Sequence, residues 1–255
     1  MGADLLRDAI RHVPPQMLLA VLRGGRRAFR DDARAMVSRL KPPPQILGRE
    51  HIPSAGPCLL TVNHYHSSTF QSWWIALTIS AALPVDVHWI TTGALTFPDA
   101  LRSAIFTPLS QWGLRQIAGA YGFTPMPPMP PRPFEAAARA QAVRRVLKYV
   151  RENETPIIGL APEGGDTPGG AIQLPPPGAG RFILHLAELG LPIAPIGAYE
   201  ENGSHCFRFG PNYCLEVEDG LPPDARDRLA AEIVMRRIAE LLPVDLRGEF
   251  NRRFQ

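Results

Sequence analysis

Long hydrophobic runs are scarce in this sequence. The longest apolar stretch, Trp73 to Leu83, is followed by Pro84 and Asp86, and it falls well short of the roughly 20 residues that a membrane span needs. Near the amino terminus, Asp4 and Asp8 interrupt the stretch where a secretory signal would need an apolar core. We therefore expect a protein that carries no secretory signal and does not cross a membrane.

Cysteine and lysine are also rare. The 3 cysteines form no Cys-x-x-Cys pair and no even set, which is typical of reduced thiols in a cytoplasmic protein. Lys41 and Lys148 are the only lysines, so nearly all of the positive charge comes from arginine, and the net charge is a modest +3. Arginine binds phosphate in a bidentate manner, although codon usage in a GC-rich genome explains the same bias.

Strand-like apolar runs alternate with helical patterns along the 255 residues. The expected strands lie at 58–62, 87–92, 157–160 and 193–199, with one or two more, antiparallel at the sheet edge, in 206–217. The expected helices lie at 1–40, 71–83, 99–119, 134–153, 181–189 and 224–242, and the proline-rich segment 124–133 is expected to be a stiff connector. The alternation predicts an α/β fold in which a central mixed β-sheet is wrapped by helices. We expect an amino-terminal helical annex at 1–44 and the α/β domain at 45–255.

The last part of the annex has the pattern of a basic amphipathic helix. Phe29, Ala33 and Met36 fall at helical spacing, and arginines such as Arg30 and Arg34 line the other side. A helix of this kind can lie in a lipid interface. Packing of the apolar stripe on the protein's own domain is the commoner explanation, and we favour it.

Two polar motifs follow directly on strand-like runs. The segment 63–68 (Asn-His-Tyr-His-Ser-Ser) follows the strand 58–62, and the segment 161–165 (Ala-Pro-Glu-Gly-Gly) follows the strand 157–160. In α/β folds the carboxyl ends of the strands gather the active site, so we expect the two motifs at one edge of the sheet. A histidine there can act as a general base, because its ordinary pKa is near neutrality.

The two motifs, with their order and setting, resemble those of the glycerolipid acyltransferase family, the 1-acylglycerol-3-phosphate acyltransferase-like enzymes that acylate lysophosphatidic acid and related lysolipids. The segment 191–196 (Leu-Pro-Ile-Ala-Pro-Ile) is similar to that family's last motif, and the resemblance extends over residues 45–200. It implies an enzyme that moves a fatty acyl group from acyl-CoA or acyl-carrier protein to a hydroxyl of a lipid-like acceptor. It also implies a place at the membrane surface on the cytoplasmic side, with no cofactor, no metal and no nucleic-acid partner.

The resemblance assigns roles to individual residues. His64 becomes the catalytic base, and Thr69 stands five residues later, where the family has an aspartate that orients the histidine. The groups that could take over this orienting role are Thr69, Ser67, His66, Glu163 and Asp166. The residues implied in substrate binding are Asn63, Tyr65, His66, Ser67, Pro162, Glu163, Gly164 and Gly165. Backbone N–H groups of residues 67–70 are expected to stabilise the oxyanion, and Tyr65, Trp73 and Trp74 are candidates for an acyl groove.

Two further differences from the family concern the acceptor. Pro125 and Asp166 stand where the family has arginines, one of which binds the acceptor phosphate. We therefore expect an acceptor other than glycerol 3-phosphate or lysophosphatidic acid. The arginines that could replace the missing cations are Arg102, Arg115, Arg132 and Arg181.

Other functions have weaker support in the sequence. The His-x-His at 64–66 is half of a metallo-hydrolase pattern, but Ser68 and Thr69 replace its remaining ligands, so we expect no metal site. No Gly-x-Ser-x-Gly of a serine hydrolase occurs, and the segment 178–180 (Gly-Ala-Gly) follows prolines rather than a strand, unlike a dinucleotide site. The alternative that stays open is a catalytically inactive protein of the same fold that binds lipid or acyl chains.

Overall fold

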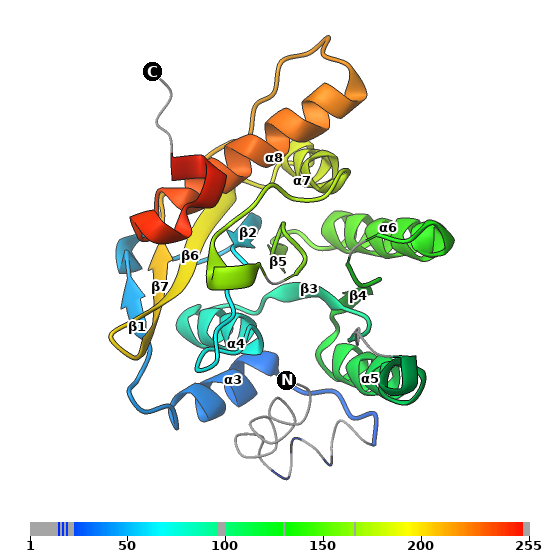
Figure 1. Cartoon of the computed structure of the whole chain (residues 1–255), viewed down its shortest axis with the longest axis vertical. Coiled ribbons are helices and arrows are strands. Elements are labelled where there is room, and N and C mark those ends of the chain that lie inside the picture. Colours follow the sequence, from blue (N-terminus) through cyan, green and yellow to red (C-terminus); the bar gives the residue numbers. More distant parts are fainter. Residues whose placement is uncertain are drawn as a thin grey trace.

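The computed structural model describes residues 15, 17, 19, 23–95, 100–129, 131–165 and 167–251 (Figure 1). Within these residues a seven-stranded sheet has the strand order β1-β7-β6-β2-β5-β3-β4. The strands are β1 (Gln45–Leu47), β2 (Cys58–Val62), β3 (His88–Thr92), β4 (Thr124–Met126), β5 (Ile157–Leu160), β6 (Ile193–Glu201) and β7 (Ser204–Phe209). Only the β6–β7 pair in this sheet is antiparallel, and the remaining neighbours are parallel. The predicted α/β fold with a mixed sheet is confirmed.

Helices cover both faces of the sheet. The α-helices are α3 (Phe29–Val37), α4 (Trp73–Ala82), α5 (Ala100–Tyr121), α6 (Ala136–Glu152), α7 (Ala179–Glu188) and α8 (Pro223–Ala239). Short 3₁₀ turns occur at η1 (Arg49–His51), η2 (Pro133–Glu135), η3 (Pro168–Gly170), η4 (Val244–Leu246) and η5 (Gly248–Asn251). In Figure 1, α3, α4 and α5 lie below the sheet, and α6, α7 and α8 lie above it. The helices from α4 onward stand close to their predicted positions.

The centre of the sheet explains why the motif-bearing strands are apolar throughout. Every residue of β2 and of β5 is buried, as expected for parallel strands that are covered on both faces. Gly159 of β5 leaves room for the neighbouring strand, because a Cβ there would lie 2.5 Å from the Trp89 ring. The central strands therefore form a close-packed support for the segments that leave their carboxyl ends.

Three details of the chain trace were predicted wrongly. Residues 124–126 are not connector but the strand β4, which pairs with β3, and Pro125 is tolerated because the strand is short and lies at the sheet edge. The strand β1 was not predicted, since three residues are too few to show a period. It pairs with β7 and places that strand inside the sheet rather than at its edge, although the antiparallel pairing of β7 with β6 is confirmed.

The annex is only partly described, because most of residues 1–22 lie outside the described residues. Its predicted helix does not run unbroken to residue 40, since residues 23–28 are not helical and α3 begins at Phe29. In α3, Ala33 and Met36 are completely buried, and α3 packs against α4. The apolar stripe therefore packs on the protein's own domain, while the domain boundary at residue 44 stays a prediction. Among the described helices, none combines the length and apolarity needed to cross a membrane.

Candidate active site

The two sequence motifs leave neighbouring strands at the same edge of the sheet. β2 lies between β5 and β6, with Thr61 paired to Leu160 and Val62 paired to Ile196. Because these three strands are parallel, the segments after β2, β5 and β6 emerge side by side. Residues 63–70, the turn at Glu163 and the end of β6 therefore form one cluster, as the sequence predicted for the first two.

A buried carboxylate joins the two motifs directly. Glu163 is only 5% exposed, and its Oε2 accepts a hydrogen bond from the backbone N–H of His64 at 2.7 Å. Its Oε1 accepts a second hydrogen bond from the backbone N–H of Gln173 at 3.0 Å. Charge-assisted bonds of this kind are stronger than neutral ones, so Glu163 holds the His64 backbone against the turn after β5.

Asn63 fixes the carboxyl end of β2 to β6. Its side chain is completely buried, its Nδ2 donates to the carbonyl of Ala198 at 2.8 Å, and its Oδ1 accepts from the N–H of Ala198 at 2.7 Å. The Asn63 side-chain amide thus adds one more pair of hydrogen bonds between β2 and β6, just beyond Val62, the last residue of β2 that pairs with β6. This geometry gives Asn63 a supporting role for the residue that follows it, His64.

The segment after His64 folds into a tight turn around the Ser67 hydroxyl. Ser67 Oγ accepts from the N–H groups of Phe70 at 2.9 Å and Thr69 at 3.3 Å, and the Ser67 N–H donates to the Phe70 carbonyl at 2.8 Å. The prediction that these amides stabilise an oxyanion is therefore wrong for these three, because their hydrogens are used inside the turn.

A carboxylate that was not predicted lies beside this turn. The Thr69 hydroxyl donates to Glu200, with distances of 2.8 Å to Oε1 and 2.7 Å to Oε2, and the Ser67 hydroxyl donates to Oε2 at 2.8 Å. Glu200 stands near the end of β6, directly after the apolar run 193–199. The rule that selected His64 and Glu163, a polar residue at the end of a buried strand, would have selected it too.

Aromatic side chains pack beneath the turn. Tyr65, Phe70 and Trp74 are all buried in the main core, and the Tyr65 and Phe70 rings meet edge to face with centroids 5.2 Å apart. Burial raises the pKa of Tyr65, and the negative charge of Glu200 acts in the same direction. Core packing thus accounts for Tyr65 and Trp74, whereas Trp73 and His66 are half-buried.

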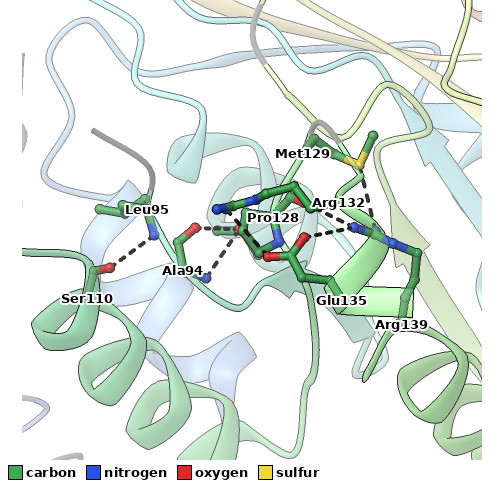
Figure 2. A network of polar contacts seen from close by, with 9 residues as sticks. Ala94, Leu95, Ser110, Pro128, Met129, Arg132, Glu135 and Arg139 are labelled. Atoms are coloured by element: carbon green, nitrogen blue, oxygen red, sulfur yellow. Dashed lines mark hydrogen bonds and ion pairs between the residues drawn. The ribbon is translucent and has the colours of Figure 1, made fainter. Parts of the chain in front are cut away.

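The Glu163 turn lies against the proline-rich segment. Pro162 is buried, and Gly164 has a left-handed φ of 69°, where a Cβ would lie 2.7 Å from Met129 Cγ. Figure 2 shows how Arg139 of α6 holds this segment, donating to the Pro128 carbonyl at 3.1 Å and to Met129 Sδ at 3.7 Å. Next to this contact, a Cβ on Gly165 would meet nothing within 4 Å. The space beside the Gly165 Cα is therefore open.

The arginines that were suggested as phosphate-binding replacements are dispersed. Arg132 pairs with Glu135 at 3.4 Å (Figure 2). Its guanidinium also lies over the Phe134 ring. Arg115 lines a pocket with His88 and Thr124, the first residues of β3 and β4. It therefore lies near the amino-terminal ends of these strands, whereas His64 follows the carboxyl end of β2. Arg181 lies in α7, where its N–H donates to Asp227, and the side chain of Arg102 and all of Asp166 lie outside the described residues.

Metal ligation finds no support in the part of the chain that the structure describes. There, no group of three or more histidine, cysteine, aspartate or glutamate side chains is suitably placed to hold an ion. The pair His64 and His66 accordingly has no third ligand among the described residues.

Comparisons with known proteins give a structural likeness but no sequence match. No family model matches the chain, and no curated protein matches it. Among solved structures, the chain is similar to the 1-acyl-sn-glycerophosphate (LPA) acyltransferase PlsC from Thermotoga maritima. The likeness has a TM-score of 0.45 and 14% sequence identity, and it covers 94% of this chain and 88% of that one.

Proposed function

We propose that this protein is an acyltransferase that moves a fatty acyl group from a thioester to a hydroxyl of a lipid-like acceptor, with His64 as the general base. The observation that carries the proposal is the hydrogen bond from the His64 backbone N–H to Glu163. It brings together the two motifs that resemble those of the glycerolipid acyltransferases. In a protein that needed only a stable sheet edge, neither the histidine nor a buried carboxylate would be required there.

The proposed reaction is a single acyl transfer. The His64 imidazole takes the proton of the acceptor hydroxyl while the hydroxyl oxygen attacks the thioester carbonyl. The new C–O bond gives a tetrahedral oxyanion, which collapses with cleavage of the C–S bond. The imidazolium then returns its proton to the departing thiolate, so the products are an ester and a free thiol, and no cofactor is consumed.

The surrounding residues have supporting roles in this proposal. Glu163 and Asn63 fix the backbone of the segment that carries His64, each through two hydrogen bonds. The Gly165 backbone, with open space beside it, is the candidate for contact with the oxyanion, because the N–H of Gly164 already donates to the Ala161 carbonyl at 3.1 Å. Preorganised donors of this kind usually give the largest single contribution to acyl transfer.

The donor and acceptor follow from the same chemistry. The donor is acyl-CoA or an acyl-carrier protein, since both present the acyl group as a thioester. Of the four candidate arginines, Arg115 lines a pocket at the amino-terminal ends of β3 and β4, and Arg132 is paired with Glu135. An acceptor with a neutral or shielded hydroxyl therefore fits better than glycerol 3-phosphate or lysophosphatidic acid.

A lipid surface is the partner that we propose for α5. Ile105, Leu109 and Trp112, spaced to share one face of this helix, are 57%, 58% and 48% exposed. The helix sequence contains no acidic residue, and its two charged residues are Arg102 and Arg115. An apolar face with only positive charges complements an anionic membrane. Because α5 follows the carboxyl end of β3, its first turns begin at the sheet edge that carries His64.

The proposal is tested by thiol release from long-chain acyl-CoA. The purified protein is assayed with a panel of lysolipids, glycolipids and plain alcohols, beside the variant His64→Ala. We expect acceptor-dependent release that falls at least about 10²-fold in the variant, with unchanged thermal stability because His64 is only half-buried. The matched control is His185→Ala, which removes a half-exposed histidine of α7 and should leave the rate unchanged.

The alternative is a catalytically inactive protein that binds lipid or acyl chains. The observation that favours it is Thr69, a hydroxyl at the position where the resembled family has its orienting carboxylate. A folded protein that binds acyl-CoA or lipid, but releases no thiol with any acceptor or with acyl-carrier protein as donor, would establish this alternative. In that case His64→Ala should change the affinity little.

A further inference from the structure

The carboxylate that position 69 lacks is present on a different strand. Both oxygens of Glu200 lie within 2.8 Å of the Thr69 hydroxyl oxygen, and Oε2 also accepts the Ser67 hydroxyl. Thr69 stands five residues after His64, and the β6 strand that carries Glu200 pairs directly with β2. A negative charge is thus held one hydrogen bond away from the side chain of residue 69.

We infer that Glu200 is the positioning carboxylate of this site, acting on His64 through the Thr69 and Ser67 hydroxyls. This inference rests on the proposed acyl transfer, in which His64 is the base. Glu200 accepts hydrogen bonds from both hydroxyls, which leaves the lone pairs of Thr69 Oγ1 free to accept from other donors. The Thr69 oxygen then accepts a hydrogen bond from the imidazole when the imidazole becomes protonated.

The physical reason is the polarisation of a hydroxyl by an anion. A hydroxyl that donates to a carboxylate becomes a better acceptor, because hydrogen bonds in a chain reinforce one another. The negative charge also stabilises a nearby imidazolium, which a hydroxyl alone would do far less well. A chain of carboxylate, hydroxyl and imidazole can therefore do part of the work of a direct carboxylate–imidazole pair.

Other titratable groups also surround the turn, and the test has to separate them from Glu200. They are Tyr65 and His66 in the segment itself, Glu163 from the turn after β5, His205 from β7 and Asp245 from η4. Glu200 accepts hydrogen bonds from the Ser67 and Thr69 hydroxyls of the turn, and Glu163 accepts one from the His64 backbone N–H. Glu201, the neighbour of Glu200, is exposed and provides a matched control.

The first experiment compares Glu200→Gln with Glu201→Gln in the wild-type background. We expect kcat/KM to fall about 10²-fold in Glu200→Gln, less than the roughly 10⁴-fold that follows loss of a carboxylate in direct contact with a catalytic histidine. We expect no change in Glu201→Gln. Thermal unfolding of both variants checks that the turn stays folded.

The second measurement is the pH dependence, which a merely structural role would not move. The ascending limb of the kcat/KM profile reports the loss of the proton from the base in the free enzyme. Removing an anion that stabilises the imidazolium favours the neutral imidazole, so the limb should move to lower pH by about half a unit or more. NMR titration of labelled histidine, with His64→Ala to assign the signal, measures the same shift without requiring turnover.

A pair of variants that moves the carboxylate from residue 200 to residue 69 tests whether the charge itself is what Glu200 contributes. Glu200→Thr removes the carboxylate, and Thr69→Asp with Glu200→Thr returns one at residue 69. We expect Glu200→Thr to be as impaired as Glu200→Gln, and the double variant to recover to within about tenfold of the wild type. Thr69→Asp alone places two carboxylates within hydrogen-bond distance and should be less stable than the double variant.

The outcomes separate this inference from the function on which it rests. A wild-type protein without His64-dependent transfer overturns the proposed function, and the NMR titration then decides whether Glu200 still acts on His64. If the wild type is active, but Glu200→Gln and Glu201→Gln have the same kcat/KM and the same ascending pH limb, the role of Glu200 is overturned. A loss of stability and rate in Glu200→Gln without a shift of the limb or of the His64 titration also overturns it, because Glu200 would then only hold the turn.

Discussion

At the scale of single residues, the site depends on side chains that bind backbone groups. Asn63 pairs with both the N–H and the carbonyl of Ala198, and Glu163 accepts the N–H of His64. Their effect is to fix where the backbone before and at His64 runs, and that backbone determines the direction of the imidazole.

The Asn63 amide gives a prediction about stability. Asn63→Leu keeps the size of the side chain but leaves two buried backbone groups of Ala198 without partners. Each unsatisfied buried group costs about 1–3 kcal/mol, so we expect the free energy of unfolding in urea to fall by about 2–6 kcal/mol. Asn153→Leu, which removes an exposed hydrogen bond to the Tyr149 carbonyl, is the control and should cost less. Equal losses in the two variants would show that the Ala198 pairing contributes nothing of its own.

The candidate site was partly predictable at this scale. His64 and Glu163 could be located because each follows a buried strand directly, and strand ends meet at one edge of a sheet. Glu200 obeys the same rule but was missed, since no motif drew attention to it. The partner of Thr69 could not be predicted, because a contact between residues 131 positions apart depends on which strands are neighbours.

At the scale of elements, close contacts between backbones constrain the helices. Gly180 in α7 faces α8 so closely that a Cβ would lie 1.9 Å from the Asp227 carbonyl oxygen. Asp227 in turn accepts hydrogen bonds from the N–H groups of Gly178 and Arg181, both at 2.6 Å, and so caps the start of α7. The pair of helices that covers β6 therefore depends on one glycine and one carboxylate.

Substitution of this glycine should separate the two helices. Gly180→Ala forces α8 to shift, since the contacted atoms are backbone, and overpacking of this kind costs about 1–3 kcal/mol or more. Gly113→Ala in α5 is the matched control, because a Cβ there would meet nothing within 4 Å. Alanine favours a helix by up to about 1 kcal/mol over glycine, so the control should be neutral or stabilising. Thermal unfolding of both variants measures the difference, and equal melting temperatures would contradict the close packing of α7 on α8.

The strands β3 and β4 and the helix α6 meet at a buried histidine. His88 is hydrogen-bonded to Thr124 at 2.9 Å, and its ring stacks on Tyr149 with centroids 4.0 Å apart. Burial lowers the pKa of His88 to about 4. The folded protein therefore favours the neutral ring, whereas the unfolded chain takes up a proton near pH 6.5.

This shift predicts a loss of stability in acid. A lowered folded-state pKa contributes stability that is complete above pH 6.5 and is lost as the pH falls toward 4, on the order of 3 kcal/mol in total. In His88→Gln, which cannot take up the proton, the fall of the unfolding free energy over that range should be smaller by this amount. Urea titrations at several pH values measure how the unfolding free energy of the wild type and of His88→Gln changes with pH. An equal fall in the two proteins would rule out His88 as the cause of the acid destabilisation.

At the scale of the whole molecule, the helix α5 leaves apolar side chains exposed to solvent. The exposed residues of α5 and the absence of acidic residues in it are the basis of the proposed lipid surface. An enzyme with a lipid acceptor gains from such a surface, because the acceptor stays in the bilayer during the reaction.

Vesicle sedimentation tests the α5 surface. The full chain should bind vesicles of phosphatidylcholine with phosphatidylglycerol, and binding should weaken with added salt. Ile105→Asn with Leu109→Asn should reduce the binding at least about tenfold, since each buried side chain of this type contributes about 1.5–3 kcal/mol. Val244→Asn in η4, also at an exposed apolar residue, should bind as the wild type does. Equal binding by all three proteins would exclude α5 as the contact.

The sequence by itself determined the alternation of strands and helices and the place of both motifs at strand ends. Those features depend on local hydrophobic patterns, which are readable over five to ten residues. The short strands β1 and β4 escaped prediction because a strand of three residues shows no period, and hydrogen bonds with distant partners define it.

Only the tertiary structure decided which groups meet at the site. The strand order places β6 beside β2, and that order alone brings Glu200 to Thr69 and Ala198 to Asn63. It also lays Met129 against the turn of Gly164. Such contacts join segments far apart in the chain, so they depend on the packing of the whole sheet rather than on any local pattern.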